Sequence, residues 1–322
     1  MTAIGIHDHP EFKLGLGHHG KADIELLEIR WKADAVPSYP ATFDSMTGIS
    51  AGLDENDRLG DCGPTSADNH RRIKSKKETG TQVNAPIAAV LDLYARSTNP
   101  PFDPATGNND NGVQMPDLLN AMRKGGLDGE KIVAFGRLKD TSDASVMAAI
   151  YTFKAVLFAV DLQVSQKSQS GGLNPIWDYV ISAAWGGHAI VAGAYAYGKI
   201  DVFSWGLRIG TTVAFRSAQL TEVWIPIYES TIEDTKDTVD YATMSAAFAS
   251  LTGGALPGVD PAPTPTPVTP PVTPPVTPPT GGGASFPGSS AAVDSHIAHV
   301  AAKAHLTVSE WLEHHFEVHF KV

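Results

Sequence analysis

The chain contains one cysteine in 322 residues, Cys62, so no disulfide bond can form within it. This excludes the disulfide-rich scaffolds typical of small secreted proteins. Charged residues are also scarce, at 18% of the sequence, and the formal net charge is −11 at pH 7. A negative chain is a poor partner for phosphate backbones, and we interpret its one basic stretch, RRIKSKK at 71–77, as the solvent-facing side of a helix. We therefore expect no nucleic-acid partner.

The sequence also lacks any apolar run long enough to cross a membrane. Its first residues, MTAIGIHDHPEFKLGLGHHG, do not contain the basic segment and following apolar segment of a signal peptide. These absences predict no signal peptide, no membrane span, and a location in the cytoplasm or on a virus particle. Apolar residues are nevertheless 42% of the chain, which is enough for a substantial core.

Helix and strand signals follow one another in the order typical of an α+β domain over 51–252. Residues 1–50 are irregular and are interpreted as an N-terminal extension. A helix is predicted to begin at Cys62, because Pro64 suits a first helical turn. Apolar spacing predicts further helices at 83–97 and 115–126, a helix and then a buried strand within 143–162, strands at 186–198 and 199–206, and short elements at 212–228 that close the sheet.

Proline dominates the region that follows. Residues 253–290 are rich in Pro, Thr and Gly, with VTPP three times in succession, which predicts an extended polyproline linker. Residues 291–322 are predicted to form a small helical unit, with a capping box at Thr307 and Glu310. A unit of about 32 residues buries too little surface to be stable alone, so we expect it to dock on a copy of itself or on a larger assembly.

Histidine is concentrated in this C-terminal unit, which holds six of the twelve in the chain. His315 and His319 are four residues apart, as two metal ligands on one helix face can be. No cysteine or carboxylate completes a specific motif around them. We therefore predict no metal and no cofactor.

The lone cysteine lies in the stretch GDCGPTSADNH, at the start of the predicted helix. A thiol attacks as the thiolate, and the positive end of a helix or a neighbouring imidazolium favours that form. His188 is the histidine whose context suits this task, since it follows two glycines at the head of an apolar strand, WGGHAIVAGAY. Such a histidine either faces the helix tip across a cleft or is a core imidazole with a backbone partner, and the local sequence allows both.

Together, Cys62 at a helix start and His188 at the head of a strand that leads to FSWG resemble the papain-like cysteine peptidase superfamily. The DCGP motif is also similar to the bacteriocin-processing branch, and the resemblance over about residues 50–228 is greatest to bacterial and phage proteins of this fold. It implies N-terminal helices with the cysteine at a helix start, packed on an antiparallel sheet that carries the histidine.

The resemblance implies a role for each matching residue. Cys62 would be the nucleophile, and His188 the general base and acid. Asn56 occupies the place of the family's oxyanion-binding glutamine, and Trp205 would cover the catalytic side chains, with Trp185 lining the site.

One position departs from the family pattern. The residue directly before SWG, where the family has the Asn or Asp that orients the histidine, is Phe203. Asp201, two residues earlier on the same strand face, or Ser204 would have to replace it.

Two functions follow from this pattern. The first is a papain-like thiol hydrolase that cleaves a peptide or other amide bond in a peptide or protein substrate. The second is a papain-like binding or structural module with a weak or inactive site, tethered by the Pro-rich linker to an assembly domain, for example on a phage particle. The intact pair of Cys62 and His188 favours the enzyme, whereas Phe203 and Asn56 favour the module.

Overall fold

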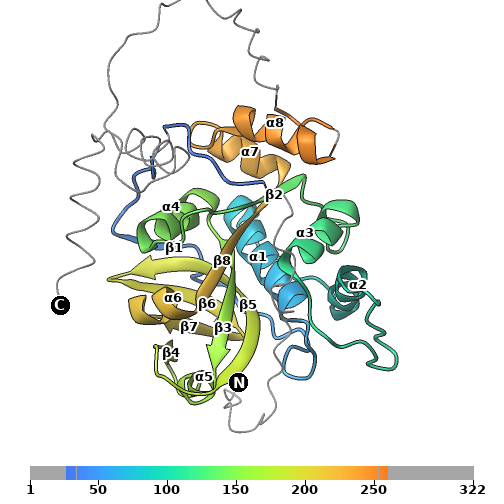
Figure 1. Cartoon of the computed structure of the whole chain (residues 1–322), viewed down its shortest axis with the longest axis vertical. Coiled ribbons are helices and arrows are strands. Elements are labelled where there is room, and N and C mark those ends of the chain that lie inside the picture. Colours follow the sequence, from blue (N-terminus) through green and yellow to red (C-terminus); the bar gives the residue numbers. More distant parts are fainter. Residues whose placement is uncertain (1–26, 34, 253, 260–322) are drawn as a thin grey trace, which may run out of the picture. The chain divides into compact units, whose positions relative to one another are not determined.

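The computed structural model describes residues 27–33, 35–252 and 254–259 (Figure 1). Residues 1–26 of the predicted N-terminal extension, most of the predicted linker at 253–290, and the whole predicted C-terminal unit at 291–322 lie outside the described residues. The capping box at Thr307 and the histidine-rich segment lie outside them as well.

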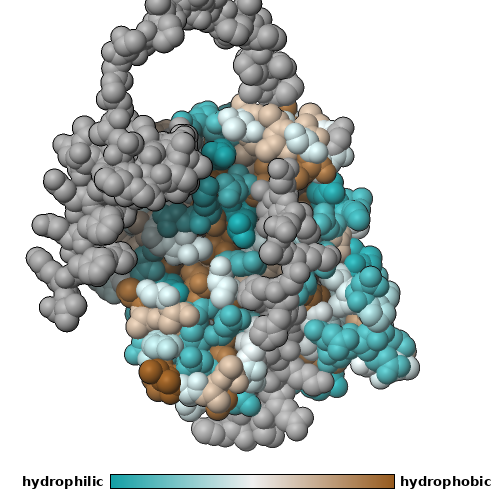
Figure 2. All heavy atoms as spheres, in the orientation of Figure 1, coloured by the Kyte–Doolittle hydropathy of each residue, from teal (hydrophilic) through white to brown (hydrophobic). Residues whose placement is uncertain are grey.

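Three helices occupy one side of the sheet, as the apolar spacing predicted. They are α1 (Cys62–Thr79), α2 (Ile87–Ser97) and α3 (Met115–Lys124), and they pack on one another, with α1 directly against the sheet (Figure 1). α1 ends at Gly80, which adopts the left-handed conformation with φ of 77° that glycine tolerates best. Figure 2 shows hydrophilic residues gathered over α2 and the loop after it, so the outer side of this layer faces solvent.

Eight strands form one sheet in the order β2-β8-β3-β5-β6-β7-β4, with β1 paired to β5 beside this path. The neighbouring pairs are antiparallel except β4 with β7. The strands are β1 (Thr42–Asp44), β2 (Ala134–Arg137), β3 (Val156–Gln163), β4 (Ile176–Trp177), β5 (Ala184–Ala196), β6 (Lys199–Ser204), β7 (Leu207–Thr211) and β8 (Leu220–Ile227). β1 lies within the predicted N-terminal extension, and its pairing ties that segment to the centre of the sheet.

The remaining helices are α4 (Asp143–Phe153), α5 (Ser165–Gln169), α6 (Val213–Gln219), α7 (Glu229–Thr235) and α8 (Tyr241–Thr252). The predicted helix and buried strand within 143–162 are α4 and β3. The segment 212–228 supplies α6 and β8, and β8 lies inside the sheet between β2 and β3. In the part of the chain that the structure describes, none of the helices combines the length and the apolar character needed to cross a bilayer.

The pleat of the central strands separates two cores. On β3, Phe158 and Val160 belong to a core that contains Trp177 and Trp205, which we call the tryptophan-side core. Leu157 and Ala159 alternate with them and belong to a core shared with α1, α2 and α3, which we call the helix-side core. The same alternation on β5 determines which side chains meet α1.

Candidate active site

Cys62 is the first residue of α1 and is almost fully buried, with 1% of its surface exposed. It belongs to the helix-side core. The next residue, Gly63, leaves no room for a side chain, because a Cβ there would lie 2.5 Å from Cγ2 of Val113. The sulfur accepts a hydrogen bond from the backbone N–H of Ala189 at 3.3 Å, and this contact fixes the helix tip against β5.

His188 precedes that backbone amide on β5 and is fully buried. Ala189 and Val191 belong to the helix-side core, and by alternation the imidazole of His188 lies on the other face, among Trp177 and Trp205. The ring stacks on Trp205 with centroids 4.5 Å apart and an interplanar angle of 23°. The Cys62 sulfur at the tip of α1 thus contacts β5 at Ala189, the residue that directly follows His188.

The two nitrogens of His188 differ in their surroundings. Nε2 lies 2.8 Å from the hydroxyl of Ser204, and among the described residues Nδ1 has no hydrogen-bond partner although it is buried. Burial lowers the pKa of His188 to about 3, so the resting ring is neutral. A neutral imidazole has one N–H and one lone pair, so in the tautomer in which Nε2 donates to Ser204 the lone pair lies on Nδ1.

Of the two residues that the sequence left open, Ser204 is the one that contacts the imidazole. The Asp201 carboxylate instead pairs with Arg208 at 2.7 Å, and Arg208 also pairs with Asp44 at 3.1 Å, on the partly exposed edge of β6 and β7. Phe203 packs in the helix-side core. Asp201, Phe203 and Ser204 thus lie in three different surroundings along β6.

Asn56 lies close to the helix tip, but its amide is engaged locally. Its Nδ2 donates to the Leu59 carbonyl and to Oδ1 of Asp61, both at 3.2 Å. Both amide protons are used within this loop, so the oxyanion role that the resemblance implies for Asn56 would require one of these bonds to open.

Asp61, directly before Cys62, is a feature of the site that the sequence interpretation did not use. Its carboxyl is fully buried, and Oδ2 has no partner among the described residues. Burial raises its pKa well above the usual range, against the hydrogen bond from Asn56, and so favours the neutral carboxyl. A negative charge beside the sulfur would disfavour the thiolate, and burial of Asp61 opposes that charge. In the sequence, the position of this acidic residue directly before the lone cysteine was the signal that could have identified Asp61 as part of the site.

Aromatic residues enclose the imidazole. The ring centroids of Trp185 and Trp205 are 5.4 Å apart. The ammonium of Lys167 lies over the Trp185 ring, 4.6 Å from its centroid. Trp177, fully buried, contacts both His188 and Trp205, and its Nε1 donates to Ser170 at 2.7 Å. Trp205 stacks on the ring of His188, and Trp177 packs against that ring edge-on.

Within the residues that the structure describes, no group of three or more histidine, cysteine or carboxylate side chains has the arrangement of a metal site. The side chains of Cys62, His188 and Ser204 supply a thiol, an imidazole and a hydroxyl.

Comparisons with known proteins give the fold. No protein-family model matches the chain, and no curated protein matches it. Among solved structures, it is similar to xylellain, a cysteine protease from Xylella fastidiosa, with 12% identity, a TM-score of 0.54, and coverage of 68% of this chain and 97% of that chain. A procathepsin L2 proteinase from Tenebrio molitor larval midgut follows, with 13% identity, a TM-score of 0.49, and coverage of 66% and 78%.

Proposed function

Because the chain has the fold of papain-like cysteine proteases, we propose that it is a thiol hydrolase that cleaves an amide bond of a peptide or protein. Cys62 is the nucleophile and His188 the proton carrier. Ser204 is a positioning residue that holds the imidazole through Nε2, and Trp205 covers the ring.

The observation that carries this proposal is the unpartnered Nδ1 of His188. A buried polar atom without a partner costs about 1–3 kcal/mol, so a histidine kept only for packing is expected to have both nitrogens satisfied. Here one nitrogen is held by Ser204, while the other has no hydrogen bond among the described residues, on the residue directly before the Ala189 amide that contacts the Cys62 sulfur. Such an atom is available to accept the thiol proton.

The proposed reaction has two steps. The thiol proton passes from Cys62 to Nδ1 of His188, the sulfur attacks the substrate carbonyl carbon, and the C–N bond breaks as His188 returns the proton to the leaving amine. Water then attacks the resulting thioester, with His188 taking the proton of the water and giving it to the departing sulfur. The acid is released and Cys62 is regenerated. The backbone N–H groups at the α1 tip are the available donors for the oxyanion.

A neutral pair is the proposed resting state. A pKa of about 3 for His188 disfavours a permanent imidazolium, so the proton moves only when a substrate engages the sulfur. His188 then remains an unprotonated base at every pH above about 4, and protonation of this residue causes no loss of activity between about pH 5 and 7.

The test uses iodoacetamide labelling of Cys62 across pH, together with hydrolysis of a mixed fluorogenic peptide library. His70 is the only other histidine among the described residues and is also buried, so His70→Gln is a matched control for His188→Ala. We expect Cys62→Ala and His188→Ala to lower hydrolysis by at least about 10³-fold, and His70→Gln to leave it within about threefold. Cys62 should label with an apparent pKa below about 8.5.

A non-catalytic papain-like module is the second candidate, and one observation favours it. With only 1% of its surface exposed, Cys62 has almost no access for a substrate. Labelling of Cys62 that is slow, shows an ordinary thiol pKa and does not change in His188→Ala, together with no hydrolysis, would select this function and contradict the enzyme.

A further inference from the structure

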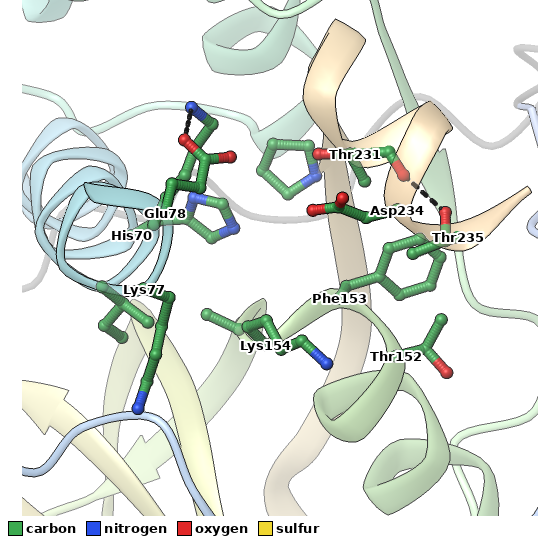
Figure 3. Close-up of a pocket in the computed structure, with 13 residues that line it drawn as sticks. His70, Lys77, Glu78, Thr152, Phe153, Lys154, Thr231, Asp234 and Thr235 are labelled. Carbon is green, nitrogen blue, oxygen red and sulfur yellow. Dashed lines mark hydrogen bonds and ion pairs between the residues drawn. The ribbon is translucent and has the colours of Figure 1, made fainter. Parts of the chain in front are cut away.

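A cavity of ≈ 330 Å³ lies beside α1, away from the sulfur, between the end of α4, the start of β3 and α7 (Figure 3). This volume is at the lower end of the range for small-molecule sites, about 300–1,000 Å³. His70, which lines the cavity, is eight residues after Cys62 on α1, so about 12 Å separates the two positions along the helix axis. Nothing in the thiol chemistry above uses this cavity.

The inner wall of the cavity carries a buried polar atom without a partner. His70 is 4% exposed, and among the described residues its Nδ1 makes no hydrogen bond. The ring donates to the backbone of Ala155, a bond that raises its pKa, but burial dominates and lowers that pKa to about 4. The neutral ring therefore donates from Nε2 and presents the lone pair of Nδ1, as an acceptor.

The rim carries two opposite charges from different elements. Asp234 projects from α7 and Lys154 from the end of α4, and both point toward the cavity that His70 lines (Figure 3). Among the described residues, neither makes an ion pair: the Lys154 ammonium donates to the Tyr151 carbonyl at 2.9 Å, and Asp234 forms no hydrogen bond. Their charges influence each other electrostatically without contact.

The other charged residues of the rim already have partners: Lys77 donates to the Asp44 carbonyl at 3.4 Å. Glu78 accepts from Lys74 and from Ser230, both at 2.7 Å. Lys74 also donates to Glu130 at 2.7 Å.

Lys154 also lies over the rings of Tyr151 and Phe43, at 5.0 and 5.6 Å from their centroids, but among the described residues it has no ion pair. In the part of the chain that the structure describes, Asp234 and Nδ1 of His70 therefore have no hydrogen-bond partner and Lys154 has no anionic one, while Ile73 and Phe153 supply an apolar wall.

We propose that this cavity binds a small zwitterion that carries a primary ammonium and a carboxylate, such as a free α-amino acid. Its ammonium donates to the Asp234 carboxylate and to Nδ1 of His70, and its carboxylate accepts from Lys154. Its side chain packs against Phe153 and Ile73. A simple cation would leave Lys154 unmatched, and a simple anion would leave Asp234 and the His70 acceptor unmatched.

The test is titration of the full chain with L-alanine and L-leucine, and with n-propylamine and propionate as single-charge analogues. Calorimetry measures affinity, and the NMR signals of the His70 ring report binding at this location. We expect saturable binding of both amino acids with a shift of the His70 signals, and at least about tenfold weaker binding of each analogue. Asp234→Asn and Lys154→Asn should each weaken amino-acid binding by at least about tenfold; asparagine also tolerates the left-handed backbone of residue 154, whose φ is 69°.

Glu233→Gln is the matched control, since Glu233 neighbours Asp234 on α7 but is exposed and pairs with Lys236. It should bind L-alanine within about twofold of the original chain. The proposal is overturned by absence of binding, by n-propylamine or propionate binding as tightly as L-alanine, or by unchanged affinity in Asp234→Asn. Binding that leaves the His70 signals unmoved would place the ligand elsewhere and also overturn it.

Discussion

At the scale of single residues, the orienting hydroxyl of Ser204 is the most informative contact. It lies 2.8 Å from Nε2 of His188, inside the tryptophan-side core. Ser204→Ala leaves a second ring nitrogen without a partner, so we expect a loss of about 1–3 kcal/mol in the free energy of unfolding. Under the proposed function, peptide hydrolysis also falls while the KM changes little, because the ring loses its orientation.

Denaturant titration and steady-state kinetics measure the two effects of Ser204→Ala. Ser168→Ala is the control, since the Ser168 hydroxyl is exposed and bonds only the nearby Ser165 carbonyl at 2.9 Å. Equal stability of the two variants would show that Ser204 does not hold the imidazole.

The carboxyl of Asp61 supports a second prediction at this scale. Because burial favours the neutral form of Asp61, we expect Asp61→Asn to remove no charge from beside the thiol and to leave the apparent pKa of Cys62 unchanged within about 0.3 units. Asp61→Ala removes the acceptor of the Asn56 amide and should cost about 1–3 kcal/mol of stability. Alkylation of Cys62 across pH measures the thiol pKa in Asp61→Asn, and urea unfolding measures the stability of Asp61→Ala. A fall of the thiol pKa by about one unit in Asp61→Asn would mean that Asp61 is ionised.

At the scale of elements, the sequence predicted what local signals determine. Pro64 in a first turn placed the start of α1 at Cys62, and the apolar run after Gly187 placed β5. The choice between Asp201 and Ser204 depends on which face of β6 meets His188. Val202, on the same face as Ser204, belongs to the tryptophan-side core and Phe203 to the helix-side core, and no local pattern encodes that assignment. The unpartnered Nδ1 of His188 and the burial of Asp61 also depend on distant segments, so only coordinates reveal them.

The junction of α1 with the α3 region gives an element-scale prediction. A Cβ at Gly63 would lie 2.5 Å from Val113 Cγ2 and 3.2 Å from Leu118 Cδ2, so Gly63→Ala should lower the free energy of unfolding by about 1–3 kcal/mol. Val113→Ala removes the closer obstacle at the expense of a small cavity. We expect the double variant to lose less free energy of unfolding than the sum of the losses of the two single variants. A double-mutant cycle by urea unfolding measures this difference. Strict additivity would mean that the helix tip is not packed this closely.

At the scale of the whole molecule, two cores meet at the central sheet, and each contains a buried histidine kept neutral. His188 lies in the tryptophan-side core, and His70 packs against Tyr228 at 5.9 Å between centroids, beside the helix-side core. The pKa of His188 is about 3 and that of His70 about 4, both below the value of about 6.5 expected in the unfolded chain. Between these values and pH 6.5 the unfolded chain binds more protons, so both histidines make stability fall as pH falls.

Buried carboxyls act in the opposite direction over the same range. The pKa of Asp54 is raised to about 7, mainly by burial and by the charge of Asp68, so the folded state holds this proton and loses stability as pH rises from about 4 to 7. The pH dependence of the total stability therefore does not isolate the contribution of the histidines. A substitution of one histidine is needed to measure it.

His70→Gln separates these contributions, because glutamine keeps an N–H donor for Ala155 but does not titrate. Relative to the original chain, we expect the free energy of unfolding of His70→Gln to increase by about 3 kcal/mol between pH 7 and pH 4. This is slightly less than the full product of about 2.5 pKa units and about 1.4 kcal/mol per unit, because the folded ring is already half protonated at pH 4. Urea unfolding at half-unit pH steps measures the difference. Parallel curves over this range would mean that His70 has the same pKa of about 6.5 in the folded and unfolded chain, and the acceptor assigned to the small-molecule cavity would then be lost below that pH, since a protonated Nδ1 donates rather than accepts.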